Sequence, residues 1–197
     1  MNVPPKPGSG DSHTSVPPSA DPERQGSQDA TGRLRVPPLE PPFHIVLLEP
    51  EIPPNTGNVA RICAATSSPL HLVGPLGFRI DEHSVRRAGL DYWHLVDLRR
   101  HLDWPHFLHA FRKERGESAR LWLFTGKARQ SWFHASPSPG DALVFGKESV
   151  GLPEDLCAMH ADWTVAIPTS GGVRSHNLAN AVGIALYEGL RRVGAIG

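Results

Sequence analysis

Five short and nearly continuous apolar runs divide the chain after residue 42. Such runs are typical of strands buried on both faces of a sheet, because neither face of the strand meets water. They span residues 43–49, 70–74, 121–124, 141–145 and 163–167. A weaker run at 92–98 predicts one more strand.

The segments between these runs have the apolar spacing of helices. Residues 101–115 place their large apolar side chains on one face and end in basic residues, as suits a helix C-terminus. Further helices are predicted at 59–67, 80–88, from Pro153 to residue 159, and at 177–192. Because strands and helices alternate, the sequence predicts an α/β fold with a mainly parallel sheet flanked by helices.

The first 42 residues differ from the rest of the chain. They contain 10 of the 20 prolines and no Phe, Trp or Tyr, and they show no periodic apolar pattern. Such a segment buries too little apolar surface to offset the entropy lost on ordering. We therefore expect a disordered, proline-rich tail at residues 1–42 and one folded domain at residues 43–197.

Charge and cysteine content limit the classes of function. The net charge is zero, so any contact with RNA must come from local basic clusters rather than from a general positive field. Two cysteines are too few for a disulfide framework, and no apolar run is long enough to span a membrane, so we expect a cytoplasmic protein. His101, His106 and His109 lie near one another but lack a fourth ligand, so no metal site is expected.

The candidate chemistry lies in three loops that follow predicted strands, after Phe124, Phe145 and Ile167. Ligands of open α/β sheets bind beyond the carboxyl ends of the strands. Small polar side chains gather at the start of the last helix, where free backbone N–H groups favour binding. The chain has neither a Gly-x-Gly-x-x-Gly fingerprint nor a P-loop, which disfavours a Rossmann-type dinucleotide-binding enzyme.

Three segments stand out at the predicted loops: Asn55–Arg61, Phe145–Pro153, and Ile167–Pro168 with Arg174–Ala181. They resemble the motifs of SPOUT-class RNA 2′-O-ribose methyltransferases, in that family's order and spacing. The runs 48–58 and 86–92 also resemble the compact members of this family that act on the wobble nucleotide of tRNA, the tRNA (cytidine/uridine-34)-2′-O-methyltransferases. The likeness covers about residues 43–193.

The resemblance implies a C-terminal trefoil knot, S-adenosylmethionine (AdoMet) as cofactor, tRNA as substrate, and a homodimer whose interface completes each active site. It also implies roles for individual residues, transferred motif by motif. The cofactor pocket would be lined by Phe124, Gly146, Ile167, Ser175 and Leu178. The catalytic group would comprise Arg61, Asn55, Glu148, Ser175 and Asn177. Contacts to RNA would come from Arg86, Arg87 and Arg174, although the first two also suit ordinary surface charge.

Two questions stay open at the level of sequence. Arg61 either binds the adjoining phosphate and orients the ribose, or loses its proton in the assembled complex and acts as the base. The function is either methylation of nucleotide 34, methylation of another tRNA or rRNA position, or binding of RNA by a knotted protein without catalysis.

Overall fold

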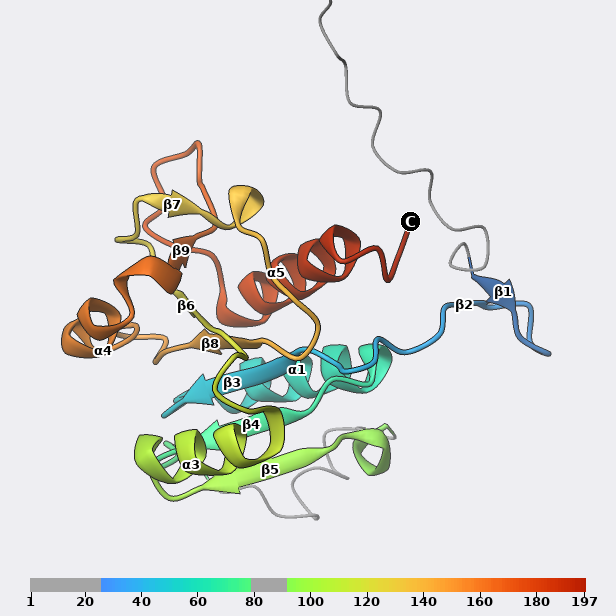
Figure 1. Cartoon of the computed structure of the whole chain (residues 1–197), viewed down its shortest axis with the longest axis horizontal. Helices are drawn as coiled ribbons and strands as arrows, with labels where there is room; N and C mark the ends of the chain where they lie inside the picture. The colour runs from blue at the N-terminus through green and yellow to red at the C-terminus, as the bar shows by residue number, and fades with distance from the viewer. Residues whose placement is uncertain (1–25, 79–91) are drawn as a thin grey trace, which may run out of the picture.

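The computed structural model describes residues 26–78 and 92–197. A sheet of seven strands runs through the centre of this part of the chain, and all of its recorded pairings are parallel (Figure 1). The strand order is β5-β4-β3-β8-β6-β9-β7. The strands are β3 (His44–Leu48), β4 (Leu70–Val73), β5 (Leu98–His101), β6 (Leu121–Phe124), β7 (Gln130–Ser131), β8 (Ala142–Phe145) and β9 (Thr164–Ala166).

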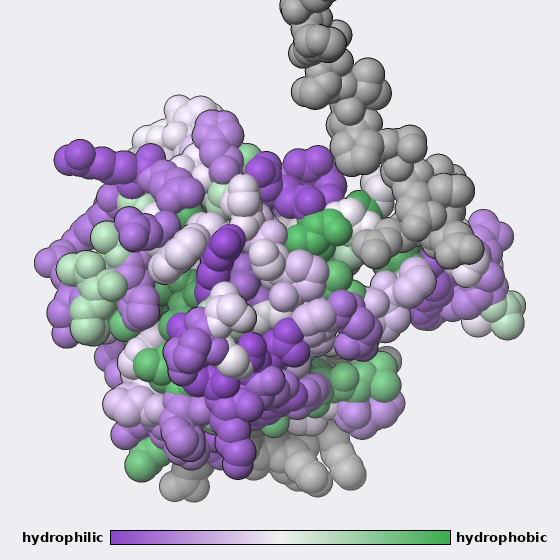
Figure 2. Space-filling view, in the orientation of Figure 1, coloured by the Kyte–Doolittle hydropathy of each residue, from purple (hydrophilic) through white to green (hydrophobic). Residues whose placement is uncertain are grey.

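Helices cover both faces of the sheet, which confirms the predicted α/β class with a mainly parallel sheet. The helices α1 (Pro53–Thr66) and α5 (Leu178–Arg192) pack on one face, and α3 (Trp104–Arg115) and α4 (Glu154–Met159) pack on the other. Alternation along β3 explains the two layers, because Ile45 and Leu47 join the first core and Val46 and Leu48 join the second. None of the described helices is long and apolar enough to cross a bilayer. The face of the molecule in Figure 2 is mainly polar, with smaller apolar areas between the polar side chains.

Several predicted boundaries were wrong for identifiable reasons. The first helix begins at Pro53 rather than residue 59, because proline is well tolerated in the first helical turn, where its missing N–H would be unpaired anyway. The predicted strand at 92–98 is instead a 3-10 turn, Trp93–Leu95. The strand follows at β5, a half-exposed edge strand that is mostly polar and therefore lacks an apolar run. The helix predicted at 80–88 lies outside the described residues.

The helix predicted from residue 101 begins at Trp104, since the carboxylate of Asp103 accepts the backbone N–H of His106 and caps it. Two further 3-10 turns, Trp132–His134 and Ala161–Trp163, follow β7 and α4.

The described part of the predicted tail contains a small hairpin of β1 (Ser27–Gln28) and β2 (Leu34–Arg35). Leu39 is buried in the same core cluster as the face covered by α1 and α5. Apolar contact with the folded domain therefore begins before residue 43, whereas the tail and the domain boundary at residue 42 stay predictions.

A row of histidine rings lies under α3. The Nδ1 of His44 is 2.9 Å from the Nε2 of His71, whose own Nδ1 is 2.8 Å from the Nε2 of His101. His101 therefore joins two buried histidines of neighbouring strands, and its ring also lies 5.4 Å, centroid to centroid, from that of His106. Among the described residues, no group of three or more His, Cys, Asp or Glu side chains is arranged to hold a metal ion.

Candidate active site

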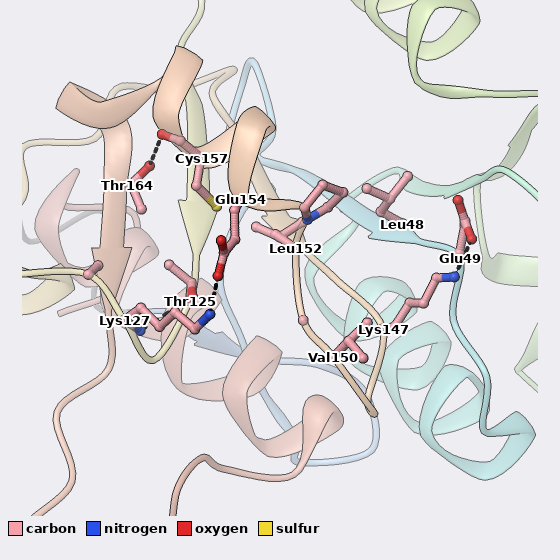
Figure 3. A pocket seen from close by; sticks show the side chains of 13 residues that line it. Leu48, Glu49, Thr125, Lys127, Lys147, Val150, Leu152, Glu154, Cys157 and Thr164 are labelled. Atoms are coloured by element: carbon pink, nitrogen blue, oxygen red, sulfur yellow. Dashed lines mark hydrogen bonds and ion pairs between the residues drawn. The ribbon is translucent and has the colours of Figure 1, made fainter.

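Loops from four strands meet at the carboxyl edge of the sheet. The segment after β3 leads into α1, and the segments after β6, β8 and β9 lie beside it (Figures 1 and 3). A side chain built on Gly126 would lie 3.3 Å from the carbonyl oxygen of Arg174, so the loops after β6 and β9 are in contact. Three of these loops carry the motifs found in the sequence.

The carboxylate of Glu148 ties the loop after β8 to the beginning of α1. Its Oε2 accepts the backbone N–H of Glu51 at 2.8 Å. Its Oε1 accepts the backbone N–H of Ile52 at 3.2 Å and the side-chain amide of Asn55 at 2.9 Å. The first turn of α1 has no acidic residue and no side-chain cap, so Glu148 supplies the negative charge that the positive end of this helix favours.

Asn55 carries the connection on to α5. Its Oδ1 accepts a hydrogen bond of 2.9 Å from the side-chain amide of Asn177. The Oδ1 of Asn177 in turn accepts the backbone N–H groups of Ala179 and Asn180, at 3.0 and 3.4 Å, and caps α5. One continuous hydrogen-bonded chain, Glu148–Asn55–Asn177, therefore fixes two helix N-termini relative to each other; we call it the carboxylate–amide chain.

The loop that presents Glu148 is closed by its own backbone. Lys147 and Gly151 form a bridge, with the Gly151 N–H donating to the Lys147 carbonyl at 2.9 Å, and Gly151 has a φ of 78° that favours glycine. A Cβ on Gly146 would lie 2.2–2.4 Å from the backbone of Gly151 and Leu152. Glycine at 146 is therefore required by the folding of this loop.

A cavity of about 720 Å³ adjoins these loops on the side of α4 (Figure 3). Ion pairs flank it, between Lys147 and Glu49 at 2.6 Å on one side and between Lys127 and Glu154 on the other. Its lining residues are Leu48, Glu49, Thr125, Lys127, Ala128, Lys147, Val150, Gly151, Leu152, Pro153, Glu154, Cys157 and Thr164.

None of the five predicted cofactor residues lines this cavity, although Thr125 and Lys147 directly follow two of them. Phe124 and Leu178 are buried in one apolar cluster, and Ile167 packs against it. The ring of Phe124 stacks on Phe145 with centroids 4.6 Å apart. Ser175 is exposed at the end of the loop that precedes α5, and its hydroxyl has no hydrogen bond within the described chain.

Arg61 does not belong to the carboxylate–amide chain. It lies six residues after Asn55 on α1, which is about 9 Å along the helix axis and on a different side of the helix. Its guanidinium carbon lies 4.5 Å from the ring centroid of Tyr92. The structure thus brings together Asn55, Glu148 and Asn177 of the predicted catalytic group and leaves Arg61 apart.

The predicted RNA-binding residues are only partly placed. Arg174 is exposed in the loop before α5 and makes no side-chain hydrogen bond or ion pair with the described residues. Arg86 and Arg87 lie outside the described part of the chain. The site roles of all the residues predicted from sequence stay predictions.

Sequence reasoning gave no role to Tyr92, although this residue contacts Arg61 and α1. It ends the run 86–92 that carried part of the resemblance. The position of an aromatic residue at the end of this run was the sequence signal that could have identified it.

The family described as "SpoU rRNA Methylase family" matches residues 42–187 of this chain. The chain belongs to the SpoU rRNA methylase family. This membership confirms the resemblance seen in the sequence, because the matched residues include all three motif segments.

Named relatives of the SpoU family cover most of the chain. The "tRNA (cytidine(34)-2'-O)-methyltransferase" of Yersinia pestis is 43% identical over 153 residues, which is 77% of this chain and 94% of the relative. The "Putative tRNA (cytidine(34)-2'-O)-methyltransferase" of Geobacillus stearothermophilus is 42% identical over 150 residues, which is 76% of this chain and 94% of the relative.

Two solved structures agree with the fold. The structure described as "Structural insights into the 2-OH methylation of C/U34 on tRNA" superposes with a TM-score of 0.70 at 48% identity and covers 76% of this chain and 95% of the other. A putative RNA methyltransferase from Bacillus anthracis superposes with a TM-score of 0.71 at 37% identity and covers 79% and 96%.

Proposed function

We propose that this protein transfers a methyl group from AdoMet to the ribose 2′-OH of nucleotide 34, a cytidine or uridine, in tRNA. The relatives at 42–43% identity are named for this reaction on cytidine 34. The observation that carries the proposal is the carboxylate–amide chain, since it joins side chains of all three motif segments at one edge of the sheet.

We propose that AdoMet binds against the loops after β6, β8 and β9. The contact between Gly126 and Arg174 and the closed loop at Gly146 give these loops the close backbone approach that such a ligand needs. Phe124, Ile167 and Leu178 supply apolar surface, Ser175 an unpaired hydroxyl, and Gly146 the fixed loop. Bound AdoMet supplies an electrophilic methyl group, and the chain's own residues bind and orient the reactants.

We also propose that the C-terminal region forms a trefoil knot. Support comes from the strand order, because β9 lies between β6 and β7, which are neighbours in sequence. The segment that forms β9 therefore inserts between two strands that an earlier part of the chain already connects, and α5 follows it. A knotted path of this kind is a rare exception among protein folds.

A homodimer is the second structural element of the proposal. Arg61 is separated from the carboxylate–amide chain within one protomer, so a second copy is needed to bring an Arg61 to each site. Exposed apolar side chains on α5, Ile184 and Tyr187, provide surface for such an interface. Sedimentation should show a dimer at micromolar concentration, and a stable, active monomer would contradict a shared site.

The chain's residues have distinct tasks in the proposed reaction. The carboxylate–amide chain fixes α1 and the N-terminus of α5, and with it the loop that carries Arg174 and Ser175. Arg61 is the cationic group directed at the RNA. The attacking 2′-OH must lose its proton during transfer, so the position of the ribose relative to its neighbours controls the rate.

We place the reaction in the cytoplasm. Both cysteines are free, and burial raises the pKa of the Cys63 thiol, which makes that cysteine unreactive. A reducing compartment suits a chain whose thiols stay unpaired.

The test is transfer of labelled methyl from AdoMet to total tRNA of a cell that lacks this protein, followed by mapping of the methylated ribose. Label at nucleotide 34 is the expected result. Label at another nucleotide would support the methyl-transfer reaction but contradict the assignment to nucleotide 34. AdoMet binding without label on tRNA or rRNA would favour a non-catalytic RNA-binding protein. Arg61→Ala should abolish transfer and leave AdoMet affinity unchanged.

A further inference from the structure

Tyr92 is hydrogen-bonded to the turn of α1 that carries Arg61. Its hydroxyl donates to the carbonyl oxygen of Gly57 at 2.9 Å. In an α-helix, this same carbonyl accepts the backbone N–H of residue 61, four positions later. The hydrogen bond of the tyrosine therefore places its ring directly beside the turn from which the Arg61 side chain leaves the helix.

The guanidinium group of Arg61 lies over the ring of Tyr92. The guanidinium carbon lies 4.5 Å from the centroid of the Tyr92 ring, within the range of a cation–π contact. The contact holds the cation without a hydrogen-bond acceptor, and the N–H groups of a guanidinium are the part that binds a phosphate bidentately.

Several other arginines of the described chain donate their N–H groups to protein acceptors. Arg99 binds Asp97 and Glu114, and Arg191 binds Glu188. Arg120 also lies over an aromatic ring, but it donates to the carbonyl of Ser136. Arg61 has no carboxylate or carbonyl partner among the described residues, so the ring holds its guanidinium group while its N–H donors stay free.

We propose that Tyr92 is a positioning residue that holds Arg61 as a fixed cation with its N–H edge free for a phosphate of the bound tRNA. The inference rests on the proposed function, because it presumes that Arg61 serves methyl transfer. It decides between the two roles left open by the sequence. A π face stabilises the protonated guanidinium, which favours a phosphate ligand and disfavours a base.

The experiment compares single-turnover methyl transfer by the full-length wild-type protein, Tyr92→Leu and Tyr92→Phe. Tyr92→Leu removes the ring and should slow transfer roughly 3- to 30-fold, the scale of a cation–π contact. Tyr92→Phe keeps the ring and should stay within about threefold of wild type, the scale of one weak hydrogen bond. The control is Leu95→Ala, an exposed residue of the same 3-10 turn, which should transfer at the wild-type rate.

The pH–rate profile separates positioning from the base role and from simple structural damage. A positioned cation predicts a uniform loss for Tyr92→Leu across the profile, with AdoMet affinity unchanged and the protein fully folded at the assay temperature. An arginine base would be deprotonated more easily without the ring, so a faster reaction or a profile moved to lower pH would overturn the proposal. A wild-type rate for Tyr92→Leu, or an equal loss in Leu95→Ala, would do so as well.

Failure of the underlying function gives a different result. If Arg61→Ala transfers methyl groups at the wild-type rate, Arg61 has no role in the reaction and the proposed function of this site fails. If Arg61→Ala is inactive while Tyr92→Leu is fully active, only the inference about Tyr92 fails.

Discussion

Replacing Glu148 by glutamine tests the central connection of the site. The carboxylate accepts three hydrogen bonds, from the backbone N–H groups of Glu51 and Ile52 and from the amide of Asn55. Glutamine has one acceptor oxygen. If that oxygen keeps the hydrogen bonds from Ile52 and Asn55, the amide NH2 of the glutamine faces the backbone N–H of Glu51. One hydrogen bond is then lost, and two hydrogen-bond donors face each other.

The expected cost follows from this geometry. A hydrogen bond to a charged group contributes about 1.5–3 kcal/mol, and the lost bond sets the scale of the loss in free energy of unfolding. For a domain of this size, that corresponds to a fall in melting temperature of roughly 3–12 °C. Displacement of Asn55 and of the α5 N-terminus by about 1 Å should slow methyl transfer roughly 100-fold.

The assay combines thermal unfolding with single-turnover methyl transfer. Glu51→Gln is the matched control, because its half-exposed carboxylate accepts the Ser149 backbone N–H, a bond that a glutamine oxygen can keep, and its unfolding transition should stay close to that of wild type. A Glu148→Gln variant with wild-type melting temperature and wild-type rate would refute the view that this carboxylate holds the site together.

Three further predictions concern the same domain. Asn177→Ala removes the cap of α5 and the bond to Asn55, and should lower the free energy of unfolding in chemical denaturation by about 1–2 kcal/mol; no change would contradict the capping role. Gly146→Ala should destabilise by about 1–3 kcal/mol because its Cβ meets backbone, whereas Gly171→Ala, which meets nothing within 4 Å, should not; equal melting temperatures would contradict this. Burial lowers the pKa of His44 to about 4 and that of His71 further, from an ordinary 6.5, so only the unfolded chain takes up these protons between those values. The free energy of unfolding should reach its maximum above about pH 6.5 and should fall by about 1.4 kcal/mol per pH unit per histidine below that pH. A melting temperature independent of pH between 5 and 7 would refute this.

Much of the sheet could be predicted because its central strands are apolar on both faces. The runs that became β3, β4, β6 and β8 stand out, since each is buried between two layers of helices. The edge strand β5 was missed because Leu98–His101 is half exposed and therefore polar. Sequence pattern reports burial, so it becomes weak wherever a strand lies at an edge.

The residues of the site were found by motif, but their arrangement was not. Asn55, Glu148 and Asn177 are hydrogen-bonded although 93 residues separate the first two and 122 separate the first and last. Arg61, only six residues from Asn55, lies on another side of the same helix. Closeness along the chain therefore gave no measure of closeness in space.

The sequence by itself determined the α/β class, the positions of the central strands and the motif residues, because apolar burial and residue identity are local properties. The tertiary structure alone decided that Glu148 binds the start of α1 and that Tyr92 supports Arg61. Both contacts join segments whose separation is set by packing of the whole sheet, and no local pattern specifies which distant side chain will meet a given backbone group.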